Sequence, residues 1–219
     1  MKKVILIAND AELTGKTLLA NLCGSLLQRS GPELFCVIHT GSEEPSEDYN
    51  IHLDLSQGFD KEEILSIIEE NAVTIIDLQS GYGEDFTNWL VDEDILDTFH
   101  DAGTELTVIS PVGTPEDSYG SLVAIAETLN SHADYMVIHN DTLTTDRSGW
   151  EGSYAKKAMT FLDAAELTLT DLGEDLDSAE AADLLSIWEE SVDLTELASR
   201  FEGDHTSSVY SWKPVAKVA

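Results

Sequence analysis

Short, continuous apolar runs alternate along the chain with longer segments in which apolar residues recur every three or four positions. The continuous runs predict buried strands, at 4–8, 34–39, 73–78, 106–110 and 135–139. The spaced segments predict helices, at 17–28, 60–71, 87–102, 115–130 and 154–165. Strands alternating with helices predict an α/β fold, a three-layer sandwich with a mainly parallel central sheet covered on both faces.

Weaker patterns complete this prediction. Residues 51–55 predict a short strand, 167–169 an edge strand and 178–201 one or two helices. Residues 203–219 show no clear period, and neither a repeat nor a low-complexity linker divides the chain. We therefore expect one domain over 1–202, followed by a C-terminal tail over 203–219.

Charge narrows the possible partners. Among 219 residues, 43 are Asp or Glu and 11 are Lys or Arg, which gives a formal net charge of -32. Such a surface repels phosphates, so we expect no direct DNA binding. No run approaches the roughly 20 apolar residues of a membrane span. The first apolar run is too short for a signal peptide. We therefore expect a cytoplasmic protein with Cys23 and Cys36 as buried thiols.

The loop after the first strand carries part of a phosphate-binding pattern. It reads NDAELTGKT over 9–17, and its last three residues match the end of G-x-x-x-x-G-K-[ST]. Backbone N–H groups at a helix start bind phosphate oxygens. A lysine here reaches the β- and γ-phosphates, and the next hydroxyl ligates Mg²⁺. The predicted nucleotide-binding residues of this loop are Asp10, Thr14, Gly15, Lys16, Thr17 and Leu18.

Residues 10–14 leave two interpretations open. Asp10 stands where the pattern has a glycine, and Asp enters left-handed backbone conformations more readily than most residues. Glu12 would repel a triphosphate unless its side chain turned to solvent or bound a cation. The loop is therefore either a working phosphate site or a decayed loop that is kept for packing.

A second motif follows the apolar run at 73–78, where Asp77 and Gly81 form Asp-x-x-x-Gly. Asp77 alone would suit a strand-end cap. The sequence resembles the ParA/MinD family of P-loop ATPases through this motif, the first loop and the segments 106–112 and 133–140. Members of that family carry a deviant Walker A motif and belong to the SIMIBI class. The resemblance covers most of residues 1–145. The spacing after Gly81 is most similar to divergent, plasmid-encoded members near partition and conjugal-transfer genes.

The resemblance implies ATP and Mg²⁺ as cofactors, with Lys16 and Asp77 in catalysis. It also implies that Thr17 and Asp77 hold the metal, that Gly81 senses the γ-phosphate and that Asn140 reads the adenine. A homodimer formed on ATP would then bind a protein partner, such as a DNA-binding adaptor. The departures from the family are Ala11 in place of its signature lysine, Glu12 and Leu13 in place of its glycines, and His39, Thr40 and Gly41 in place of its acidic residues.

These departures argue for a slow ATPase at best and leave two functions. The first is a nucleotide-binding switch, with a role in plasmid partition or DNA transfer. The alternative is a pseudo-ATPase, a binding module on the same fold whose acidic surface docks a basic protein. The acidity suits a basic partner, a high-salt cytoplasm or an ordinary solvated surface.

Overall fold

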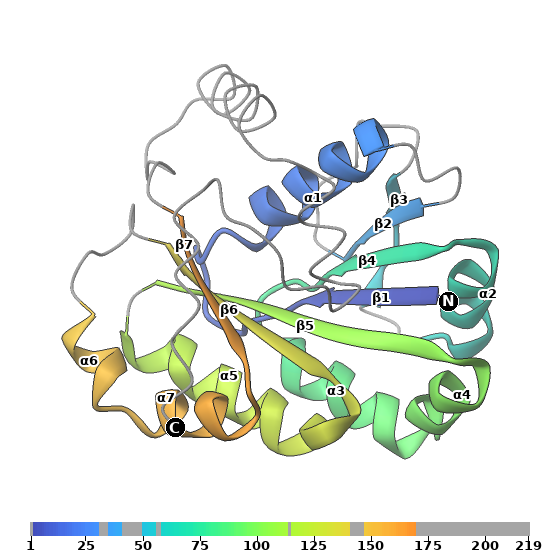
Figure 1. Ribbon diagram of the computed structural model, residues 1–219. Coiled ribbons are helices and arrows are strands. Elements are labelled where there is room, and N and C mark those ends of the chain that lie inside the picture. The colour runs from blue at the N-terminus through green and yellow to red at the C-terminus, as the bar shows by residue number, and fades with distance from the viewer. Residues whose placement is uncertain are drawn as a thin grey trace.

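The computed structural model describes residues 2–30, 35–40, 50–55, 58–113, 115–140 and 147–169. Seven parallel strands form a sheet in the order β3-β2-β4-β1-β5-β6-β7 (Figure 1). The strands are β1 (Lys2–Ile7), β2 (Phe35–His39), β3 (Asn50–His52), β4 (Val73–Asp77), β5 (Thr104–Val112), β6 (Asp134–Asn140) and β7 (Ala165–Leu169). The predicted α/β class and its parallel sheet are confirmed.

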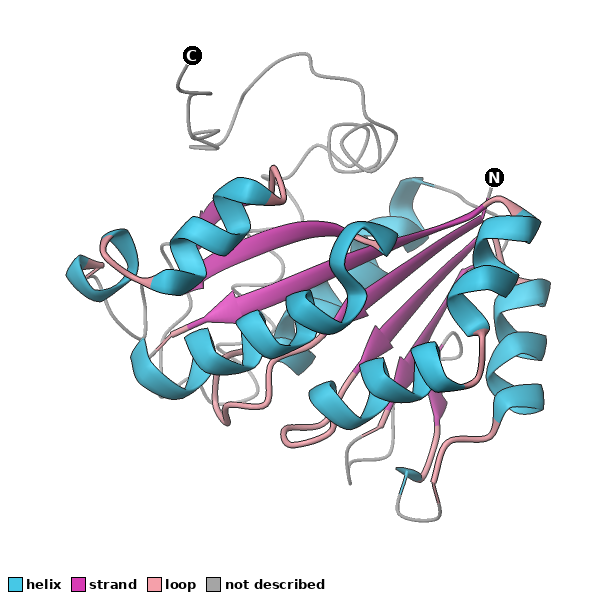
Figure 2. Cartoon of the chain, turned by 90° about the horizontal axis from the view of Figure 1, so that it is seen from below, coloured by secondary structure: helices cyan, strands magenta, loops and turns pink. Residues whose placement is uncertain are grey.

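Helices cover both faces of this sheet. They are α1 (Lys16–Ser30), α2 (Lys61–Glu70), α3 (Gly83–Asp92), α4 (Ile95–Ala102), α5 (Pro115–Leu129), η2 (Asn130–His132), α6 (Ser148–Glu151) and α7 (Tyr154–Phe161). Helix α1 contacts β1, β2 and β4 on one face, whereas α3, α5 and α7 pack in a row on the other (Figures 1 and 2). The chain therefore forms the expected three layers.

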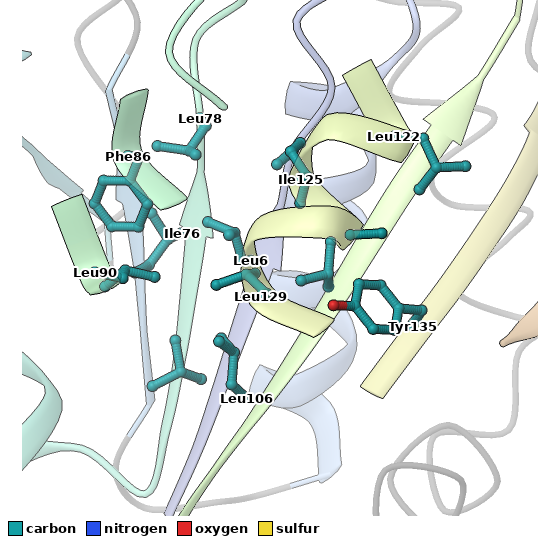
Figure 3. Packing of buried hydrophobic residues seen from close by; sticks show 14 of the residues in the cluster. Leu6, Ile76, Leu78, Phe86, Leu90, Leu106, Leu122, Ile125, Leu129 and Tyr135 are labelled. Atoms are coloured by element: carbon teal, nitrogen blue, oxygen red, sulfur yellow. The ribbon is translucent and has the colours of Figure 1, made fainter. Parts of the chain in front are cut away.

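The sheet is buried because apolar side chains alternate between its faces. On β1, Leu6 points into the cluster under α5, where it meets Ile125 and Leu129 (Figure 3). All three side chains are fully buried. Burying one such side chain stabilises the fold by about 2 kcal/mol. This core fixes β1 at the centre of the sheet, and so fixes the start of the loop that follows it.

Two predicted helices differ from the structure. The single helix expected over 87–102 is two helices, because Asp94 takes the left-handed conformation with φ 55° and ends α3. Helix α3 also begins at Gly83, before the predicted start at residue 87. The helix expected over 154–165 ends at Phe161, since Asp163 at φ 55° turns the chain into β7. Left-handed aspartates of this kind carry no clear signal in the periodicity.

The weaker predictions have mixed outcomes. The edge strand at 167–169 is confirmed as part of β7, which pairs with β6. The short strand at 51–55 is β3, which ends earlier than expected. The helices predicted over 178–201, the tail over 203–219 and the end of the domain at 202 lie outside the described residues. No helix in the described part of the chain is long and apolar enough to cross a membrane.

Both cysteines are free and buried, as predicted. Cys23 lies on α1, where burial raises the pKa of its thiol to about 12. Cys36 lies on β2, where burial raises the pKa of its thiol to about 11 despite a hydrogen-bond contact with Thr74. Neither thiol is therefore a reactive nucleophile in the folded chain.

Candidate functional site

Loops from several strands meet at the carboxyl edge of the sheet, around the end of β1. The chain leaves β1 into α1 on one face, and it leaves the neighbouring β4 into α3 on the opposite face. Parallel α/β sheets bind ligands at such a reversal, beyond the carboxyl ends of the strands. The loop 8–15, which connects β1 to α1, lies at this position.

Asn9 holds the start of this loop. Its Nδ2 lies 3.1 Å from Ser110 Oγ, 3.1 Å from the Pro111 carbonyl oxygen and 3.0 Å from that of Ser118. Its Oδ1 accepts a hydrogen bond of 3.0 Å from the backbone N–H of Ala11. Sequence reasoning did not assign Asn9 to the site. The only signal was a polar residue directly after a buried strand.

The loop turns through two left-handed residues, Leu13 with φ 57° and Gly15 with φ 95°. Asp10, at the position of the pattern's first glycine, does not need the left-handed conformation that Asp tolerates, because its φ is not positive. Leu13 is 88% exposed, so no packing of its side chain offsets the backbone strain. A Cβ on Gly15 would lie 3.3 Å from Nδ2 of Asn140. The sharp turn before α1 therefore forms despite the missing glycines.

Asp10 turns its carboxylate toward α3. Oδ1 accepts a hydrogen bond of 2.5 Å from the N–H of Gly83, and Oδ2 accepts one of 3.2 Å from Glu84. The N-cap residue of α3 itself, Tyr82, makes no side-chain cap. The Asp10 backbone N–H donates to Ser121 Oγ at 2.7 Å. The carboxylate of the loop thus satisfies a distant helix start, and any contact of Asp10 with a nucleotide stays a prediction.

Lys16 is buried at the start of α1. Its Nζ donates to the Ala11 carbonyl oxygen at 3.0 Å and to Ser80 Oγ at 2.9 Å. Burial lowers the pKa of the Lys16 amine, whereas the carboxylates of Asp77, Asp10 and Glu12 act to raise it. Three carboxylates are therefore near enough to favour the charged form of the amine.

The side chains around Lys16 differ in exposure. Glu12 is exposed, which agrees with the expectation that a tolerated carboxylate here turns to solvent. Thr17 is exposed, and Leu18 is partly buried. Gly81, with φ 83°, is exposed in the turn before α3. The hydroxyl assigned to Mg²⁺ is therefore accessible from outside.

Asp77 ends β4 and pairs with a histidine. Its Oδ2 lies 2.9 Å from Nδ1 of His39, which is its direct neighbour in the register between β2 and β4. Both side chains are buried. Sequence reasoning noted His39 only as a departure from the family. Its place at the carboxyl end of the strand predicted over 34–39 was the signal that could have put it at the same edge of the sheet as Asp77.

Two buried polar atoms in this region stand out among the described residues. Oδ1 of Asp77 and Oγ1 of Thr14 have no hydrogen-bond partner. Nδ2 of Asn140 lies 3.5 Å from the carbonyl oxygen of Thr14, so β6 reaches the same loop. The structure thus brings loop 8–15 together with Lys16, Asp77 and Asn140.

This donor set fits a nucleotide with Mg²⁺. A free carboxylate oxygen and an exposed hydroxyl are ligands that Mg²⁺ prefers, either directly or through water. A buried lysine and the N–H groups at the start of a helix suit phosphate oxygens. At the metal position, His39 competes with a cation because it engages the second oxygen of Asp77.

No protein-family model matches the sequence, and no curated protein matches it either. Among solved structures, the chain is similar to the MinD cell division protein of Aquifex aeolicus, with a TM-score of 0.50 and 13% identity over 96% of this chain and 100% of that one. It also matches FlhF complexed with GMPPNP/Mg(2+), with a TM-score of 0.38 and 13% identity over 86% and 74%. At 13% identity the likeness to MinD shows the fold alone, and the chain shares the α/β fold of that protein.

Proposed function

We propose that this chain is a ParA/MinD-like nucleotide switch that binds ATP with Mg²⁺ at loop 8–15 and the start of α1. Lys16 and the backbone N–H groups of the loop bind the phosphates, and Thr17 with Asp77 holds the metal. Gly81 reports the γ-phosphate to α3, and Asn140 contacts the base. Mg²⁺, when bound, supplies positive charge that offsets the charge of the phosphates.

The observation that carries this proposal is the unsatisfied Oδ1 of Asp77. A buried polar atom without a partner costs about 1–3 kcal/mol. Native structures keep few such atoms, and each one calls for an explanation. A cation or its bound water at the end of β4 would remove this cost. If Asp77 only capped the end of the strand, its Oδ1 would be hydrogen-bonded. The fold alone therefore does not explain the unpaired oxygen.

Binding would act on assembly and partners. If ATP binds the homodimer more tightly than the monomer, it shifts the equilibrium by the difference between the two affinities. The net charge of -32 then favours a basic protein partner, such as a DNA-binding adaptor in plasmid partition or DNA transfer. Ala11, at the position of the family's lysine, leaves at best a slow ATPase.

A second candidate is the pseudo-ATPase, which docks a basic partner without a nucleotide. The observation that favours it is the state of Lys16, whose Nζ already donates to Ala11 and Ser80. A ligand must compete with both of these acceptors.

Titration of the full chain with a fluorescent ATP analogue and Mg²⁺ separates the two candidates. We expect saturable binding by the wild type and a loss of about 10-fold to 100-fold in Lys16→Ala, because hydrogen bonds to charged groups contribute about 1.5–3 kcal/mol. Lys157→Ala removes an exposed lysine on α7 and serves as the matched control, which should bind like the wild type. Equally weak signals from wild type and Lys16→Ala would reject the switch.

A further inference from the structure

Asp10 places a negative charge in a loop that is proposed to hold phosphates, and the structure shows where this charge goes. Both carboxylate oxygens accept N–H groups from the first turn of α3. The start of a helix carries partial positive charge, so it stabilises a carboxylate. The charge of Asp10 is therefore directed away from the loop and toward α3.

Gly83 makes this approach possible. A Cβ at Gly83 would lie 2.8 Å from Oδ1 of Asp10 and 3.0 Å from Cδ1 of Ile125. Any other residue would force the carboxylate or the helix to shift. Loop 8–15 and α3 thus lie closer together than a side chain at this position would allow.

Further contacts link the same two segments. Oγ of Ser80, in the loop that leads to α3, lies 3.2 Å from the Ala11 carbonyl oxygen. Lys16 Nζ donates to both of these oxygens. The backbone N–H of Asp10 is held by Ser121 on α5, and α5 packs along α3. A movement of the loop at Asp10 would therefore also displace α3.

We propose that Asp10 is a positioning residue that ties loop 8–15 to the first turn of α3, so that a ligand that moves the loop also moves this helix. The response to ATP rests on the proposed function, whereas the tie itself does not. Helix α3 in turn carries Trp89 and Phe86, whose rings lie 5.2 Å from that of Phe59. The tie therefore connects the loop to the segment before α2.

Amide hydrogen exchange of the nucleotide-free full chain tests the tie. In Asp10→Ala we expect exchange at the start of α3 to be about tenfold faster, because two capped amides lose their acceptor. Asp10→Asn keeps an accepting oxygen and should remain within about threefold of the wild type. Glu12→Ala removes an exposed acid of the same loop and should change nothing in α3. Wild-type exchange in Asp10→Ala, or equal acceleration in every segment, would overturn the proposal.

Gly83→Ala perturbs the contact from the side of helix α3 and leaves Asp10 in place. We expect it to lower the melting temperature, although alanine favours helices more than glycine does. In an Asp10→Ala background the same change should cost clearly less, because the carboxylate that the Cβ would meet is gone. Additive shifts in melting temperature would overturn the proposal even if Asp10→Ala alone were too unstable for exchange measurements.

Adding the ATP analogue and Mg²⁺ then tests transmission. Each variant is compared at a ligand concentration that saturates it. Wild type and Asp10→Asn should show a change in α3 exchange on binding, and Asp10→Ala should lose that change. An equal α3 response in Asp10→Ala would overturn the proposal. Absence of binding by the wild type would instead reject the proposed function, and the nucleotide-free exchange would still decide whether the tie exists.

Discussion

A buried carboxylate, Asp77, and a partly buried one, Glu166, each lie beside a histidine of the neighbouring strand but have opposite surroundings. Oδ2 of Asp77 lies 2.9 Å from Nδ1 of His39, and Oδ1 has no partner. Oε2 of Glu166, on β7, lies 3.4 Å from Nε2 of His139 and accepts from Trp150 Nε1 at 3.2 Å. Its Oε1 pairs with Lys156. Both oxygens of Glu166 are therefore satisfied.

The complete set of partners around Glu166 determines the direction of its pKa shift. Burial alone would raise the pKa of Glu166, but hydrogen bonds from His139, Lys156 and Trp150, together with the charge of Lys156, lower it to about 2. The Trp150 ring also stacks edge-on against His139 at 5.1 Å and lies 5.9 Å from the amine of Lys156. This complete cluster ties β6 and β7 to α6 and α7. A complete polar cluster stabilises the fold, whereas an incomplete one leaves room for a ligand.

Replacing each acid by its amide gives the largest expected contrast. Glu166→Gln should lower the free energy of unfolding by about 3 kcal/mol, because it weakens three hydrogen bonds to the carboxylate and leaves the partly buried amine of Lys156 beside an uncharged partner. Asp77→Asn should change it by less than about 1 kcal/mol, because only one oxygen had a partner. Urea denaturation measures both. The contrast fails if Asp77→Asn is the more damaging change.

The two amides should differ in ligand binding in the reverse order. Asp77→Asn should weaken the effect of Mg²⁺ on ATP binding, and Glu166→Gln should leave it unchanged. A shared loss would place both acids in one site.

The pH dependence of stability should come next in size. The pKa of Glu166 is about 2 in the folded chain against an ordinary value of 4.5, so its contribution to stability is fully present above pH 4.5 and is lost as the pH falls through 2. We expect about 2 kcal/mol, allowing for partial solvent screening. The difference in unfolding free energy between wild type and Glu166→Gln should therefore shrink between pH 5 and pH 2. A difference that stays constant over this range would contradict the assignment.

Leu13→Gly is the smallest expected effect and tests strain in the candidate site. Relief of the left-handed backbone should stabilise the fold by about 1 kcal/mol, since the exposed side chain gives up no packing. Asp163→Gly, at φ 55° before β7, is the matched control and should gain less, because aspartate tolerates this conformation better. Thermal unfolding measures both, and a loss of stability in Leu13→Gly would reveal a contact of its side chain.

The fold could be predicted from the sequence because each strand is a local run of apolar residues. The prediction placed β1, β4, β5 and β6 within a few residues, and with them Lys16, Asp77 and Asn140 at one edge of the sheet. The break at Asp94 was missed because a left-handed aspartate looks like any polar residue on an exposed helix face.

The missed parts of the site depend on contacts between distant segments. Helix α3 begins at Gly83 because Asp10 accepts its first N–H groups, and 73 positions separate these residues. His39 faces Asp77 only because β2 and β4 are neighbours, which the order of strands along the chain does not reveal. Local patterns can suggest a phosphate loop, but they cannot show which segment holds it in place.

The two buried thiols allow local opening of the unmodified chain to be measured by their labelling rates. A sulfhydryl reagent reaches Cys23 only when α1 lifts from the sheet, and it reaches Cys36 only when β2 opens. Since α1 begins at Lys16 and β2 ends at His39, each labelling rate reports how often one side of the candidate site opens. Local breathing at the loop can thus be timed without adding a dye or a mutation.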